Sequence, residues 1–125
     1  MTQLRTQEQM QKRLSLLQGE IDNDTALNKI IDAFLLSAKE LVEDLLACSP
    51  DSDVKTVNRQ AHTLGGSSRN LGAADLAEWA EILEKQTNET TAGWSPAFDK
   101  QELSRLYALT CQTLAEVRMN LLVKK

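Results

Sequence analysis

The apolar residues between positions 24 and 47 constrain the fold more than any other feature of this chain. They recur at three- and four-residue steps: Leu27, Ile30, Ile31, Phe34, Leu35, Ala38, Leu41, Val42, Leu45 and Leu46. This spacing predicts a long amphipathic helix from about Asp24 to Ala47, with its apolar stripe facing a core. Phe34 is expected in that core, with an exposed binding patch as the alternative.

Four other segments of the chain have weaker helical periodicity in their apolar residues. The helices expected from them cover residues 3–18, 53–71, 73–87 and 98–123. Gly19 is expected to end the helix of residues 3–18. Gly72 is expected to be the left-handed residue that ends the helix of residues 53–71. One of Asp51, Ser52 or Asp53 is expected to cap the N-terminus of the helix that begins near residue 53.

These elements predict an all-α fold, an antiparallel four-helix bundle with an additional short N-terminal helix. Residues 1–125 are expected to form a single domain, in which 1–22 provide the N-terminal helix and its connection and 23–123 provide the bundle. Residues 88–96 are expected to form the longest loop. Trp94 in that loop is expected to pack on the end of the bundle, with a recognition patch as the alternative.

Composition excludes several classes of function. The net charge of −4 argues against binding of nucleic acid, which needs clustered Lys and Arg. Cys48 and Cys111 lack the spacing and the companion histidines of a metal site, so packed, reduced thiols and no metal are expected. Neither a signal peptide nor an apolar run of membrane-spanning length is visible, which predicts a cytoplasmic module without membrane contact.

The only histidine, His62, is the candidate functional residue. The buried stripe expected on its helix consists of Val54, Val57, Ala61, Leu64, Ser68 and Leu71. His62 projects roughly 120° from the centre of that stripe, so its ring is expected to face water or a partner. Its neighbours on the helical wheel combine positive charge with small residues: Lys55, Asn58, Arg59, Gly65, Gly66 and Arg69. Such a surface suits an anionic group.

The adjacent glycines Gly65 and Gly66 need a reason, because each costs a helix about 1 kcal/mol relative to alanine. Close approach of a neighbouring helix is one explanation. Gly66 lies on the histidine side of the wheel, however, where no bundle neighbour is expected. We therefore expect Gly65 and Gly66 to give a second protein room to approach the imidazole.

The residues around His62 carry a family resemblance. Ala61-His62-x-Leu64-x-Gly66-Ser67-Ser68-x-x-Leu71-Gly72-Ala73, followed by Leu76 and a Leu83-Glu84 pair, resembles the signature of histidine-containing phosphotransfer (HPt) domains. These domains are relay modules of multistep two-component signalling. The resemblance implies that His62 accepts a phosphoryl group from a receiver-domain aspartate and passes it to another receiver. It also implies that the first helix contributes to the docking surface, with a frayed helix that covers the core as the alternative.

The chain departs from the family at Gly65, where a lysine usually stands three residues after the histidine. Arg69, Arg59 and Lys55 are expected on the same face and are the candidates to replace its charge. Asn58 or Ser67 is a candidate to hold the ring or the phosphate, although Ser67 has the alternative of bonding to its own helix backbone.

The partners implied by the resemblance are response-regulator receiver domains and a hybrid sensor kinase. The chain is expected to be a monomeric phosphocarrier with no cofactor and no kinase site of its own, and Mg²⁺ is expected on the partner receiver only. Two alternatives remain open. One is an adaptor that binds a receiver without phosphotransfer, and the other is an enzyme using His62 as general base, for which the sequence offers no evident second catalytic group.

Overall fold

The computed structural model describes residues 2–21, 24–48, 53–89 and 100–123. These residues form five helices and no strand: α1 (Thr2–Ile21), α2 (Asp24–Leu46), α3 (Val54–Asn70), α4 (Ala74–Glu89) and α5 (Lys100–Val123). The all-α prediction is therefore confirmed. Among these helices none is long and apolar enough to cross a bilayer.

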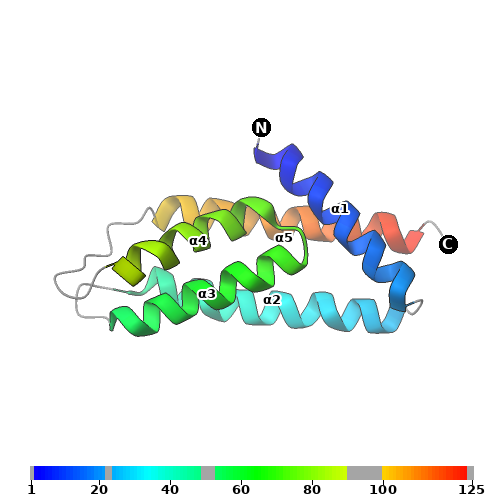
Figure 1. Cartoon of the computed structure of the whole chain (residues 1–125). Helices are drawn as coiled ribbons and strands as arrows, with labels where there is room; N and C mark the ends of the chain where they lie inside the picture. Colours follow the sequence, from blue (N-terminus) through cyan, green and yellow to red (C-terminus); the bar gives the residue numbers. More distant parts are fainter. Residues whose placement is uncertain (1, 22–23, 49–52, 90–99, 124–125) are drawn as a thin grey trace.

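The helices α2 to α5 lie alongside one another as a bundle, and α1 crosses it obliquely (Figure 1). The hairpin of α3 and α4, with 17 and 16 residues, is shorter than α2 and α5, with 23 and 24. Helix α1 packs on α2, α4 and α5 beyond the turn of that hairpin. It thus covers a part of the long helices that the hairpin leaves open.

All five helices contribute to one apolar core. Its fully buried large side chains include Met10, Leu14, Leu27, Ile31, Leu45, Leu64, Leu76, Leu103 and Leu114. Phe34 is buried, which confirms its predicted core position. Because Met10 and Leu14 belong to the same cluster, α1 covers the core, as one of its two expected roles requires.

Local signals placed the helix ends well, with two corrections. Gly19 does not end the first helix, which continues to Ile21, because a glycine adopts helical angles at a cost of only about 1 kcal/mol. Asn88 belongs to α4 and not to the following loop, and its side chain accepts a hydrogen bond from α3. The predicted placement of Trp94 lies outside the described residues.

The ends of α3 are built as predicted. Asp53 is its N-cap, accepting hydrogen bonds from the Lys55 backbone N–H and the Thr56 hydroxyl. Gly72 has a φ of +78°, the left-handed conformation expected of it. The backbone N–H groups of Gly72 and Ala73 donate to the carbonyls of α3's last turn, at 3.1 and 2.8 Å, as in a Schellman motif.

The two cysteines are free thiols, as expected. Cys48 is buried near the end of α2, and Cys111 is half-buried on α5. Burial raises the pKa of the Cys48 thiol, an effect that the nearby positive charge of Lys100 only partly offsets.

Candidate functional site

His62 lies near the middle of α3, and its side chain is 72% exposed. The opposite face of α3 is buried through Val57, Ala61, Leu64 and Ser68. The predicted exposure of the imidazole is confirmed. The ring is therefore open to a partner while the helix that carries it is held by the core.

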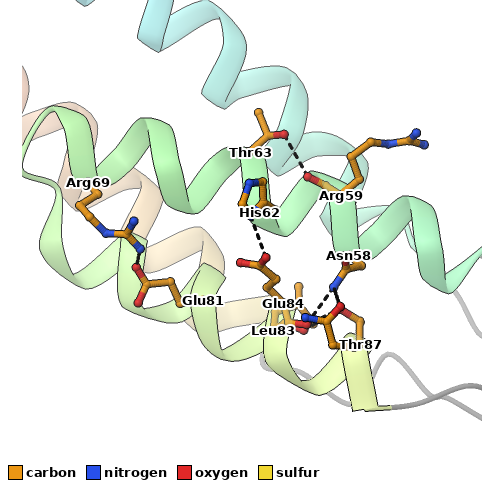
Figure 2. A network of polar contacts seen from close by, with 10 residues as sticks. Asn58, Arg59, His62, Thr63, Arg69, Glu81, Leu83, Glu84 and Thr87 are labelled. Atoms are coloured by element: carbon orange, nitrogen blue, oxygen red, sulfur yellow. Dashed lines mark hydrogen bonds and ion pairs between the residues drawn. The ribbon is translucent and has the colours of Figure 1, made fainter.

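Glu84 of α4 is the polar neighbour of the His62 ring. Nδ1 of His62 lies 2.7 Å from Oε2 of Glu84, across the gap between α3 and α4 (Figure 2). An ionised carboxylate only accepts hydrogen bonds, so in the neutral ring this contact places the proton on Nδ1 and the lone pair on Nε2. Within the described part of the chain, no hydrogen bond to Nε2 is formed. The arrangement leaves Nε2 as the ring nitrogen without a hydrogen-bond partner among the described residues.

Sequence reasoning did not assign a role to Glu84, although the Leu83-Glu84 pair formed part of the family resemblance. The spacing of the two residues about Gly72 nevertheless indicates that they lie close together. His62 and Glu84 lie at nearly equal distances along the chain from the turn at Gly72, so an antiparallel hairpin brings them together. The general-base alternative had no evident second catalytic group in the sequence, and the structure now places the Glu84 carboxylate beside the His62 ring.

Asn58 binds α4 and does not contact the ring. Its Nδ2 donates to the backbone carbonyl of Glu84 and to Oγ1 of Thr87, both at 2.9 Å, and to Oδ1 of Asn88 at 3.0 Å. The side chain is part of the contact between α3 and α4, one turn before His62. None of these hydrogen bonds goes to the ring, and a direct role of Asn58 in holding the phosphate stays a prediction.

Among the described residues, the basic side chains of α3 form no hydrogen bond with the His62 ring. The guanidinium of Arg69 forms an ion pair with Glu81 of α4, and the Arg59 side chain extends away from the His62 ring (Figure 2). Lys55 is exposed in the first turn of α3, and Ser67 is half-buried. Support of a phosphoryl group by Arg69, Arg59, Lys55 or Ser67 stays a prediction.

The two glycines differ in environment. A Cβ built on Gly65 would lie 3.5 Å from Cβ of Ala80 and 3.6 Å from Cγ of Glu81, whereas one on Gly66 would meet nothing within 4 Å. Gly65 is buried in the contact with α4, so its predicted role in partner approach is wrong: the neighbouring helix occupies that side. Gly66 borders open space, as predicted.

The contact with Glu84 favours one neutral tautomer of His62, and the site leaves the ring exposed. Hollows among the described residues lie away from His62, one lined by residues between Asp44 and Gln60 and another along Gln7 to Ser15 of α1. No group of three or more possible metal ligands occurs among the described residues. A histidine that is exposed outside these hollows, with an unprotonated Nε2, is suited to react with a chemical group carried by another protein.

This combination of helical bundle and exposed, oriented histidine fits the class of proteins that carry a phosphoryl group on histidine. The match to a family model agrees: residues 5–116 match the model of the Hpt domain. The chain belongs to the Hpt domain family. Such domains are phosphocarrier modules of phosphorelays, where their partners are the receiver domains of response regulators. Neither the search of curated proteins nor the search of solved structures gave a match.

Proposed function

We propose that this chain relays phosphate between receiver domains, accepting a phosphoryl group on Nε2 of His62 from one receiver aspartate and giving it to another. The observation that carries this proposal is the 2.7 Å contact between Nδ1 of His62 and Glu84 on an exposed ring. That contact leaves the lone pair of Nε2 directed away from Glu84. Membership of the Hpt family supports phosphotransfer as the reaction.

In the first step the Nε2 lone pair attacks the phosphorus of the aspartyl phosphate, and the bond between phosphorus and the aspartate oxygen breaks. The aspartate leaves as a carboxylate, and the imidazole becomes a phosphorylated imidazolium with its proton on Nδ1. Glu84 is placed to stabilise that positive charge through the existing contact. In the second step another aspartate attacks the phosphorus, and the ring leaves with its electron pair on Nε2.

The charges that the transferred phosphoryl group needs are proposed to come from both proteins. Arg69 lies one helical turn after position 65, where the family usually has a lysine, and it would have to exchange Glu81 for the phosphate. Arg59 and Lys55 add positive potential on the same helix. The Mg²⁺ ion and the ATP site are proposed to belong to the partner receiver and the hybrid kinase, and this chain to act as a cytoplasmic, monomeric phosphocarrier.

The proposal is tested by incubating the chain with a receiver domain carrying radiolabelled aspartyl phosphate. Because the chain has a single histidine, any phosphohistidine it acquires is on His62. We expect acid-labile, alkali-stable label in the wild type and none in His62→Gln, with matching circular dichroism spectra. Equal labelling of both proteins would contradict the proposal.

The same experiment separates the proposal from the adaptor alternative. Binding of the phosphorylated receiver is measured in parallel by calorimetry, with Gly66→Gln as the variant whose protruding side chain should block the interface. Tight receiver binding without label on His62 would select the adaptor and exclude the relay.

A further inference from the structure

Asn58 and His62 lie one turn apart on the same side of α3, and both bond to the same residue of α4. The Glu84 side chain contacts the ring at 2.7 Å, and the Glu84 carbonyl accepts from Asn58 at 2.9 Å (Figure 2). The residue that orients the imidazole is thus held at its main chain by the helix that carries the imidazole. Asn58 and His62 of α3 are therefore linked to each other through Glu84 of α4.

The orientation of the Asn58 amide follows from its partners. A backbone carbonyl only accepts hydrogen bonds, so the atom facing Glu84 must be the amide nitrogen. Its two N–H groups are shared among three acceptors: the Glu84 carbonyl, Oγ1 of Thr87 and Oδ1 of Asn88. The Thr87 hydroxyl is itself within 2.9 Å of the Leu83 and Glu84 carbonyls. These bonds surround the main chain of Glu84 near the end of α4.

We propose that Asn58 is a positioning residue for His62, which acts by holding Glu84 in register with the imidazole. Helix ends fray, and α4 ends at Glu89, little more than one turn after Glu84. Without Asn58 that turn loses the hydrogen bonds that this side chain donates to Glu84, Thr87 and Asn88. The Glu84 carboxylate then restrains the ring less, and both neutral tautomers become populated. The kinetic consequence rests on the proposed function, whereas the effect on the ring does not.

The test measures the tautomer of the ring directly, without any partner. Long-range ¹H–¹⁵N spectra of the full chain resolve Nδ1 and Nε2 of its single histidine at a pH where the ring is neutral. We expect the wild type to carry its proton mainly on Nδ1. Asn58→Asp, which keeps the size but removes both N–H donors, should shift the ring towards a mixture of tautomers. Asn58→Ala should do the same, and it serves if the aspartate variant does not fold.

A matched control is available on the other side of α3. Gln60→Ala removes a side-chain hydrogen bond from α3 to Asp44 of α2, at 3.3 Å, without touching α4. We expect it to leave the tautomer unchanged. In a Glu84→Ala background, which abolishes the restraint, Asn58→Asp should cause no further change in the ring.

Phosphotransfer provides the second readout. Asn58→Asp should slow phosphorylation of His62 roughly fivefold, about the loss expected from one net hydrogen bond, and the slowing should vanish in the Glu84→Ala background. An unchanged tautomer in both Asn58 variants, or slowing that adds fully to that of Glu84→Ala, would overturn the inference. If the tautomer shifts as expected but wild-type His62 takes no phosphate, the proposed function fails and the positioning role of Asn58 stands.

Discussion

Neighbouring residues on one helix meet different surroundings, and Gly65 and Gly66 are the clearest case here. Gly65 lies against the small residues of α4, Ala77 and Ala80, where the absence of a side chain lets the two helices approach. Gly66 borders open space next to the exposed histidine. The contact with α4 therefore explains the absence of a side chain at Gly65, whereas no described neighbour within 4 Å explains it at Gly66.

Enlarging Gly66 should affect transfer and not folding. We expect Gly66→Gln to leave the melting temperature unchanged or to raise it, since no atom lies within 4 Å of the new Cβ and the helix gains up to about 1 kcal/mol. The long side chain should nevertheless slow phosphotransfer by about tenfold or more by blocking the partner. Thermal unfolding and receiver-to-His62 transfer rates measure the two effects.

Gly65→Ala is the matched control, because its methyl group would make ordinary contacts with α4 and would not reach the partner's side. Transfer by this variant should stay within about twofold of the wild type. Equal slowing by both variants, or none by Gly66→Gln, would show that Gly66 is not at the interface.

At the scale of whole helices, α1 is fastened to the turn between α3 and α4. Its Thr6 hydroxyl donates to the Asp75 carboxylate at 2.6 Å, and Nε of its Arg13 donates to the Asn70 carbonyl at 2.8 Å. The backbone of Gln9 and Met10 passes directly over Gly72. Gly72 therefore serves both the left-handed turn and the close approach of α1.

Replacing Gly72 should disrupt the packing of α1 against the turn between α3 and α4. Gly72→Ala is expected to lower the free energy of unfolding by at least about 2 kcal/mol, because the left-handed conformation alone costs an alanine about 1–2 kcal/mol. The added Cβ would also overlap the Gln9 carbonyl and lie 2.7 Å from the Met10 nitrogen. Urea unfolding followed by circular dichroism measures the loss.

Gly66→Ala is the control for Gly72→Ala, since it has the same chemistry in an open, helical position and should stabilise by up to about 1 kcal/mol. A Gly72→Ala variant as stable as the wild type would mean that α1 does not lie against this turn.

For the molecule as a whole, alkaline stability depends on how α5 is packed. Burial, together with the hydrogen bond to Cys111 and the negative charge of Glu43 on α2, raises the pKa of Tyr107 to about 12. The folded state thus favours the neutral phenol. This contribution to stability is complete below the unfolded pKa of about 10 and is lost as the pH rises through about 12.

Because Tyr107 is the only tyrosine, phenolate absorbance reports on it alone. We expect the native protein to ionise near pH 12 and the urea-unfolded chain near pH ~10. Tyr107→Phe should lose less stability between those pH values. Native ionisation at the ordinary pKa would contradict the packing of α5 against α2 at this point.

Much of this molecule follows from local chemistry. The apolar periodicity of residues 24–47, the Asp53 cap and the glycine at position 72 each depend on residues within a turn or two, so their helices and ends were predictable. The exposure of His62 was predictable for the same reason, because a buried stripe defines its opposite face. Gly19 was misjudged because propensity alone is a weak determinant of where a helix ends.

Only the tertiary structure decided which helix lies on each side of the buried stripe of α3. The apolar periodicity of α3 predicts which of its residues face the core. It does not predict which helix packs on either side of that buried face. The packing of α4 beside His62 buried Gly65, brought Glu84 to Nδ1 and turned Asn58 towards the end of α4. These are contacts between residues more than a dozen positions apart, and they depend on the relative placement of two helices. The sequence by itself determined that a histidine would be exposed on a helical bundle, and the tertiary structure determined which of its ring nitrogens faces Glu84 and which one is left open.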